Sequence, residues 1–192
     1  ILESTEKIDQ HVKRAKGITQ RMLGFGRRMN PGRTEILINS LTDQAAEMLK
    51  TEATNRNIDI IREYDPQVPV ILSDPAQLEQ FFINIIDNAI DAIGKNGSLT
   101  IRTLAWKKGV RILFTDSGPG MDQETVTRIF DPFFTTKKVG EGTGLGLAIC
   151  YTILEKLGGR IEVQSRLGEG TTFSITLPAE PPQLPPEDGL PA

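Results

Sequence analysis

The clearest pattern along the chain is a run of apolar residues between positions 75 and 93. They recur every three or four positions, which places them on one face of a helix. Asp74 and Pro75 begin the run, and Gln77 occupies the third helical position, a combination typical of helix starts. The pattern therefore predicts a helix over residues 75–93. The residues of its predicted apolar face are Leu78, Phe81, Phe82, Ile85, Ile86, Ala89, Ile90 and Ile93.

Shorter patterns on both sides of this helix predict the remaining elements. Alternating and β-branched runs predict strands over residues 34–39, 58–61, 68–72, 98–106, 110–116, 160–164 and 171–177. Helical spacing predicts helices over residues 41–55, 122–129 and 145–157. Turn residues at 107–109 and 166–170 predict two hairpins.

The first thirty residues carry a different pattern, an apolar stripe that repeats every seven residues. One row consists of Ile1, Ile8, Ala15 and Met22, and a second of His11, Ile18 and Phe25. This spacing is typical of a coiled coil or helical bundle, which Pro31 ends. The tail from Pro178 holds six of the twelve prolines, which predicts disorder. We therefore expect a helix over 1–30, a domain over 31–178 and a proline-rich tail over 179–192.

Composition and charge exclude several classes of protein. The net charge is −3, so no nucleic-acid binding is expected, although residues 1–33 carry +5 and the remainder −8. Cys150 and His11 are the only residues of their kinds, which argues against disulfides, thiolate metal sites and Ser-His-Asp triads. No run approaches the roughly 20 apolar residues of a membrane span, so no membrane contact is expected. The chain opens inside a helical pattern without Met, and we expect it to be part of a longer protein.

Three polar residues lie close together at the edge of the predicted apolar helix face. Because a helix turns about 100° per residue, Asn84, Asn88 and Asp91 fall within about 60° of one another. A half-buried carboxamide can ligate a cation through its oxygen, and Mg²⁺ takes such ligands together with nucleotide phosphates. The alternative is that these three residues are solvated helix positions or helix caps. The spacing by itself favours this alternative.

Two glycine-rich turns indicate a nucleotide site. In the first, Asp116 ends a predicted strand and precedes Gly118 and Gly120. Its carboxylate could accept a hydrogen bond from the adenine amine, while the glycines allow close approach of the ring. The second turn, residues 142–146, runs into a predicted helix, whose starting N–H groups could bind phosphates. For the first turn, the alternative is an ordinary strand ending.

Between the two turns, three phenylalanines precede two lysines. Phe130, Phe133 and Phe134 could anchor one end of a mobile loop. Lys137 and Lys138 could then reach phosphates as point charges. The alternative is a core aromatic cluster beside two solvated lysines, which is compatible with an anchored loop.

In their order along the chain, these segments resemble the conserved boxes of bacterial sensor histidine kinases. The matching segments are the asparagine box at 84–92, the first glycine box at 116–120, the phenylalanine box at 130–134, the second glycine box at 142–147 and the terminal segment 168–173. The resemblance covers residues 1–178. Asp91 stands where one branch of the family has a phosphate-binding Lys, so the nitrogen-regulator-like branch fits better.

The resemblance implies an ATP-binding α+β fold, shared with gyrase, MutL and the heat-shock chaperone ATPase. A mixed, mostly antiparallel sheet would be covered on one face by three helices, after a long N-terminal helix. By motif position, Asn88 would ligate Mg²⁺, and Asn84 and Lys137 would act in catalysis. Asp116 would bind adenine, with Thr171 nearby. The other nucleotide-binding positions that the resemblance implies are Asp91, Gly118, Gly120, Phe130, Lys138, Gly142, Thr143, Gly144, Leu145, Gly146 and Leu147.

The implied activity is transfer of the ATP γ-phosphoryl group to a histidine on a hairpin helix, for relay to an aspartate in a response-regulator receiver domain. Residues 1–30 would be the second helix of this hairpin, through which the full-length protein forms a homodimer. His11 is followed by Val12 rather than an acidic residue, so we interpret it as a packing residue and expect the acceptor histidine outside this chain. The implied location is cytoplasmic, either free or as part of a membrane-bound sensor.

Two other functions are compatible with a nucleotide site. One is an ATP-hydrolysing conformational switch of the gyrase, MutL or chaperone type. Those proteins use a Glu where this chain has Asn84, and a carboxamide is a poor general base. The other is a non-enzymatic dimerisation module with a vestigial site, against which Asn88 and Asp116 argue.

Overall fold

The computed structural model describes residues 33–137 and 142–180. The predicted N-terminal helix with His11, the lysine at position 138 and the tail from residue 181 lie outside the described residues, so the domain boundaries stay predictions. Within the described ranges, no helix combines the length and the hydropathy that crossing a bilayer requires.

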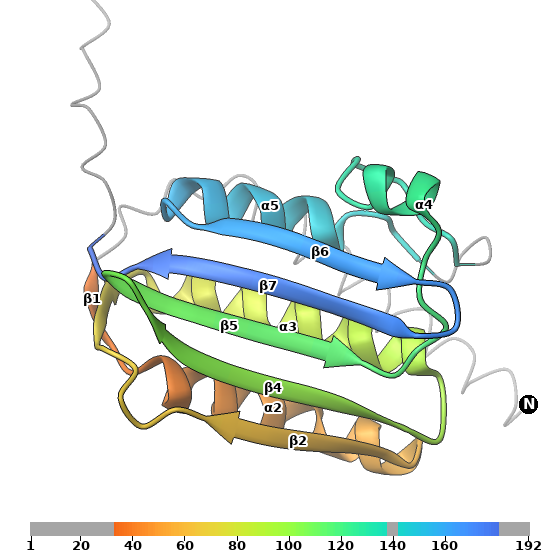
Figure 1. Ribbon diagram of the computed structural model, residues 1–192, viewed down its shortest axis with the longest axis horizontal. Coiled ribbons are helices and arrows are strands. Elements are labelled where there is room, and N and C mark those ends of the chain that lie inside the picture. Colours follow the sequence, from red (N-terminus) through yellow and green to blue (C-terminus); the bar gives the residue numbers. More distant parts are fainter. Residues whose placement is uncertain (1–32, 138–141, 181–192) are drawn as a thin grey trace, which may run out of the picture. The chain divides into compact units, whose positions relative to one another are not determined.

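A five-stranded sheet forms one layer of the domain (Figure 1). Its strand order is β2-β4-β5-β7-β6, with β2 parallel to β4 and all other neighbours antiparallel. The strands are β2 (Ile58–Tyr64), β4 (Gly97–Trp106), β5 (Gly109–Asp116), β6 (Arg160–Arg166) and β7 (Gly170–Pro178). A separate two-stranded sheet pairs β1 (Thr34–Ile36) antiparallel with β3 (Ile71–Ser73).

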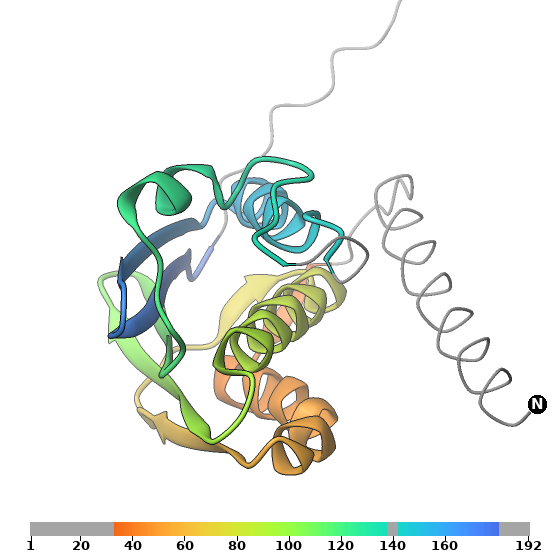
Figure 2. The same cartoon turned by 90° about the vertical axis from the view of Figure 1, so that its right-hand side faces the viewer.

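α2 (Ile38–Asn55), α3 (Pro75–Ile93) and α5 (Gly146–Lys156) cover one face of the five-stranded sheet, as the turned view shows (Figure 2). The short α4 (Gln123–Arg128) lies between α3 and α5 in the sequence. α3 lies between α2 and α5 and packs against both. The predicted α+β fold, with a mostly antiparallel sheet and three helices on one face, is confirmed.

α3 has the bounds that the sequence predicts, because its start is capped and its apolar face is buried. Asp74 Oδ1 accepts hydrogen bonds from the N–H groups of Ala76 at 2.9 Å and Gln77 at 3.2 Å. The Gln77 side chain donates to Asp74 Oδ2 at 2.8 Å instead of the cap backbone. Residues that are at most 3% exposed on this helix are Leu78, Phe81, Phe82, Ile85, Ile86, Ala89 and Ile90.

The two short strands differ from the sequence expectation at their ends. The strand expected over 34–39 ends at Ile36, because the chain turns directly into α2. The strand expected over 68–72 begins only at Ile71. Pro69 has no N–H group to donate to a strand ladder, which delays the start of pairing.

Candidate nucleotide site

Asp116 is the last residue of β5, and only 4% of it is exposed. Its Oδ1 accepts a hydrogen bond from the Gly118 N–H at 2.8 Å, and the Thr171 N–H on β7 also bonds to this carboxylate. Burial raises the pKa of Asp116, and the two backbone bonds counter only part of that rise. The result is a desolvated and fixed acceptor, suited to an exocyclic amine.

β7 and β6 contribute hydroxyl groups next to this carboxylate. Thr171 is paired with Asp116 in the β5–β7 register and is 6% exposed. Its Oγ1 lies 2.9 Å from Oγ of Ser165 on β6, which accepts a hydrogen bond from the Met121 N–H at 2.8 Å. A hydroxyl network therefore joins the end of β5 to the turn that follows it.

The glycines after Asp116 are required by the protein's own backbone. Gly120 has φ +67°, and a Cβ there would lie 1.9 Å from the Arg166 carbonyl oxygen. A Cβ on Gly118 would lie 2.8 Å from Asp116 Oδ1 and 3.2 Å from the backbone of Ala92 on α3. The turn after β5 can therefore close against β6 and α3 only because these residues lack side chains.

Asn84 and Asn88 lie one turn apart on α3, on the side that meets α5. A Cβ on Gly146 would lie 3.4 Å from Asn88 Nδ2. Asn84 is 9% exposed, and its Nδ2 has no hydrogen-bond partner of good geometry among the described residues, although the buried Cys150 thiol lies beside it. Burial raises the pKa of that thiol. The Asn84 amide therefore lies buried on the face of α3 that meets α5, beside Cys150.

The start of α5 leaves its first N–H groups open to a ligand. Its N-cap is Leu145, and no side chain of the described part of the chain caps the helix. Thr143 Oγ1 accepts the Leu145 N–H at 3.4 Å. A Cβ on Gly142 would lie 3.1 Å from the Lys137 side chain, so the turn also runs close to that lysine. Since a helix start carries partial positive charge, this end of α5 is suited to phosphate.

Two of the three phenylalanines anchor the segment between α4 and α5. Phe130 packs against Tyr151 of α5, with ring centroids 5.6 Å apart. The Arg128 guanidinium lies 4.5 Å from the centroid of Phe134. Phe133 differs, because 73% of it is exposed. The sequence expectation of an aromatic anchor thus applies to its first and last members.

Lys137 extends from this segment to α3. Its Nζ lies 2.5 Å from Asp91 Oδ2, and Asp91 Oδ1 accepts a hydrogen bond from Arg56 Nη1 at 3.0 Å. Three positions singled out on α3, Asn84, Asn88 and Asp91, therefore lie along the same side as the lysine and the start of α5. Sequence reasoning missed Arg56, which precedes Asp91 by 35 residues and belongs to no local motif.

The site therefore has two chemically different ends joined by α3. The buried carboxylate of Asp116 marks one end, where Gly118 approaches Ala92. The Asn84 and Asn88 amides and the start of α5 mark the other, and Lys137 contacts α3 between Asn88 and Ala92, at Asp91. A rise of about 1.5 Å per residue puts the Cα atoms of Asn84 and Ala92 roughly 12 Å apart. A ligand with a hydrogen-bonding ring at one end and phosphates at the other fits these residues.

Comparison with known proteins identifies the fold and the order of these segments. Residues 73–181 match the family model described as histidine kinase-, DNA gyrase B-, and HSP90-like ATPase. The chain belongs to this family. Within the family, the catalytic domain of histidine kinase ThkA is 35% identical, with a TM-score of 0.71, over 78% of this chain and 97% of that domain.

Curated relatives point to the same branch of this ATPase family. Sensor histidine kinase ZraS of Escherichia coli (strain K12) is 39% identical over 141 residues, which are 73% of this chain and 30% of ZraS. Sensor kinase CckA of Brucella abortus (strain 2308) is 36% identical over 188 residues, which are 89% of this chain and 20% of CckA. The chain thus spans less than a third of these relatives. A structure of ThkA in complex with response regulator protein TrrA is 29% identical, with a TM-score of 0.74, over 90% of this chain and 49% of that chain.

The sequence boxes of the histidine kinase ATPase domain include most of the candidate residues described above and leave others out. Leu145 and Leu147, which the second glycine box includes, supply partly buried side chains to the core. Ser165 was missed because a single serine in a strand carries no signal of its own. Its alternation with exposed neighbours in β6 places it on the helix-covered face, which is the one indication that the sequence offers.

Proposed function

We propose that this chain provides the ATP-binding catalytic region of a sensor histidine kinase. It would transfer the γ-phosphoryl group of ATP to a histidine, for relay to an aspartate in the receiver domain of a response regulator. The observation that carries the proposal is the combination of buried Asp116 at one end of the site with the uncapped start of α5 at the other, and with Lys137 bound to α3 between them. The ThkA–TrrA complex supports the kind of partner through family likeness.

At the end of the site that holds Asp116, which we call the ring end, Asp116 would recognise adenine. Its carboxylate is held by two backbone N–H groups and would accept a hydrogen bond from the exocyclic amine. Thr171 and Ser165 would hold the surrounding hydroxyl network in place. Gly118 and Gly120 keep the turn close to α3 and β6, so that the carboxylate stays fixed.

At the other end, side chains and backbone N–H groups would bind the ATP phosphates and help to neutralise their charge. ATP supplies the transferable phosphoryl group, and Mg²⁺ reduces its negative charge. The Asn88 amide oxygen would be a Mg²⁺ ligand, a role that suits a hard cation. Asn84 would lie near the phosphates, as its motif position implies, and Lys137 and the first turn of α5 would bind phosphate oxygens. Transfer of this kind depends mainly on positioning, which these fixed groups provide.

The acceptor histidine would come from another helix. His11 is the only imidazole in the chain, and Val12 follows it instead of an acidic residue. We propose that residues 1–30 form part of a dimerisation hairpin whose other helix carries the acceptor. The full-length protein would be a homodimer through this hairpin, located in the cytoplasm.

Nucleotide binding and phosphotransfer test this proposal separately. Calorimetry should show binding of Mg-ATP by this chain, and incubation with γ-labelled ATP should leave the chain itself unlabelled. Addition of a hairpin helix that carries a histidine next to an acidic residue should produce acid-labile label on that helix. Stable label on this chain alone, lost in His11→Gln, would make His11 the acceptor.

Steady-state hydrolysis separates the proposal from an ATP-driven switch. The amide of Asn84 cannot activate water as a carboxylate does, so turnover of ATP without an acceptor helix should be negligible. Sustained release of inorganic phosphate that is lost in Asn84→Ala would favour the switch.

A further inference from the structure

Arg56, Asp91 and Lys137 form an ion-pair chain at the part of α3 that follows Asn88. Lys137 Nζ lies 2.5 Å from Asp91 Oδ2, and Arg56 Nη1 lies 3.0 Å from Asp91 Oδ1. Each carboxylate oxygen thus binds a different cation. Arg56 is itself held from its other side by Glu52 on α2, with Nη2 2.5 Å from Glu52 Oε1.

The Asp91 carboxylate is charged and partly shielded from water. Its side chain is 28% exposed. Burial alone would raise the pKa of Asp91, but Lys137 and Arg56 outweigh burial and hold this pKa below its usual value. A negatively charged side chain repels phosphate, so direct contact between Asp91 and the phosphates is unfavourable. Asp91 must therefore act through the cations that it holds.

Lys137 can bind Asp91 and a ligand at the same time. Asp91 is three residues beyond Asn88, so the two side chains lie on one side of α3. Lys137 comes from a segment 46 residues later in the chain, where its own N–H donates to Thr135 Oγ1 at 3.2 Å. An ammonium group has three N–H donors, and Asp91 Oδ2 occupies one. Two donors remain for a ligand.

We propose that Asp91 and Arg56 are positioning residues that hold the Lys137 ammonium where it can reach the phosphates of a bound nucleotide. Arg56 fixes the Asp91 carboxylate, and Asp91 fixes the lysine. This inference rests on the proposed function, since it concerns how the nucleotide site obtains its cation. In this chain, the positive charge at this point of α3 comes from a distant lysine, which an acidic residue on the helix holds in place.

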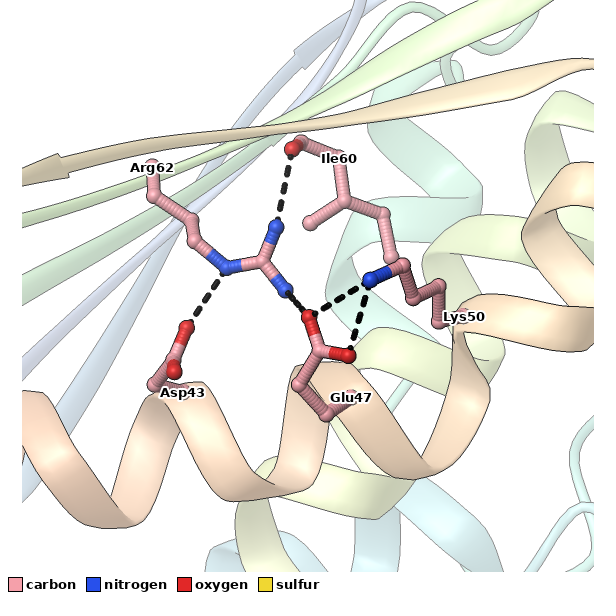
Figure 3. Close-up of polar contacts among 5 residues, drawn as sticks. All are labelled: Asp43, Glu47, Lys50, Ile60 and Arg62. Carbon is pink, nitrogen blue, oxygen red and sulfur yellow. Dashed lines mark hydrogen bonds and ion pairs between the residues drawn. The ribbon is translucent and has the colours of Figure 1, made fainter.

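A network of the same kind elsewhere in the domain provides a matched control. Arg62 on β2 binds Asp43 Oδ1 through Nε at 2.6 Å and Glu47 Oε1 through Nη2 at 2.6 Å, and Lys50 lies 3.0 Å from Glu47 Oε2 (Figure 3). The Asp43 side chain is 45% exposed. Asp43 precedes Arg56 by 13 residues on α2, which separates the two networks by about 20 Å along the helix. Asp43→Asn removes the same charge without reaching the nucleotide site.

The test is a double-mutant cycle on nucleotide affinity, measured by calorimetry with ATP and with adenosine. The variants are Asp91→Asn, Lys137→Met and the pair of both. Asp91→Asn should weaken ATP binding by about threefold to tenfold in the original chain, and by less than about twofold where Lys137 is already Met. Adenosine affinity should stay unchanged in all three, which also shows that they fold. Asp43→Asn should leave both affinities unchanged.

Arg56→Gln tests whether Arg56 holds the Asp91 carboxylate in place. It should weaken ATP binding by about twofold to threefold, and it should have no further effect in Asp91→Asn. An additive effect of the two substitutions would remove Arg56 from the proposal.

Three results would overturn the inference as a whole. Equal weakening by Asp91→Asn with and without Lys137 would show that Asp91 acts independently of the lysine. Tighter ATP binding by Asp91→Asn would show that Asp91 competes with the phosphates for Lys137. Loss of adenosine binding would show a structural role alone. Absence of ATP binding by the unchanged chain would instead refute the proposed function, and the inference with it.

Discussion

Phe133 and Gly144 are joined by a hydrogen bond from the Phe133 N–H to the Gly144 carbonyl oxygen at 2.9 Å, and both residues have positive φ, 69° and 64°. The two ends of the segment between the phenylalanines and α5 therefore meet at Phe133, whose backbone is strained, and at a glycine that adopts its φ without strain. A non-glycine residue adopts such φ values at a cost of about 1–2 kcal/mol. The contact fixes where the second glycine turn enters α5, and hence where the phosphate end of the site lies.

Gly144→Ala should destabilise the domain and weaken nucleotide binding. A Cβ at this position would lie 2.3 Å from the Phe133 carbonyl carbon, in addition to the strain of φ +64°. We expect a loss of about 2 kcal/mol or more in the free energy of unfolding, measured in urea.

Gly168→Ala is the matched control for this substitution. Gly168 has φ +82°, but a Cβ there meets no atom of the described residues within 4 Å. We expect a loss of about 1 kcal/mol from backbone strain alone, with ATP affinity unchanged. Equal losses for the two variants would contradict a specific role for the Phe133–Gly144 contact.

Asp116→Asn should weaken ATP binding by about 1–3 kcal/mol, the range for a hydrogen bond to a charged group. The substitution keeps the size of the side chain but removes the charge that accepts the amine. Calorimetry measures the effect directly. Asp122→Asn is the control, since Asp122 accepts a hydrogen bond from the Thr125 N–H as the N-cap of α4 and Asn caps equally well. If Asp116→Asn binds ATP as the original chain does, adenine is recognised elsewhere.

The raised pKa of Asp116 predicts a specific pH dependence of stability. Burial makes the folded chain take up a proton at Asp116 more readily than the unfolded chain. The cost of burying the charge is therefore present at neutral pH and is relieved as the pH falls through the raised pKa. The free energy of unfolding of the original chain, relative to Asp116→Asn, should rise on acidification from about pH 7 to about pH 4. Urea unfolding of both proteins across this range measures the difference, and parallel curves would contradict it.

Asn88→Ala should abolish the tightening of ATP binding by Mg²⁺ without unfolding the domain. Asn88 lies at the edge of the buried face of α3, beside Gly146, so its loss leaves the core intact. Calorimetry with and without Mg²⁺ measures the metal effect, and thermal unfolding confirms the fold. A full metal effect in the variant would move the ligand to another residue.

The parts of the fold that sequence predicts best are those where local and tertiary forces agree. α3 has its predicted bounds because the cap at Asp74 and the apolar period specify the same helix. The short β3 was misplaced because apolar residues around Pro69 resemble a strand although the backbone cannot pair there. The turn residues were found from their spacing, but Arg56 was not, because its role arises from the packing of α2 on α3. Phe133 shows the same limit, since a phenylalanine in a motif gives no indication that its side chain faces water.

The late position of β7 in the chain has a consequence for synthesis. Asp116 is held by an N–H group of Thr171, which follows it by 55 residues. When the chain has left the ribosome only as far as β5, Asp116 is present but the Thr171 N–H group that holds it is not. Because domains fold as units once their strands have emerged, the nascent chain gains the ring end of its site only when β7 leaves the tunnel. A truncation before Gly170 should then remove nucleotide recognition even though every residue of α3 and α5 is present.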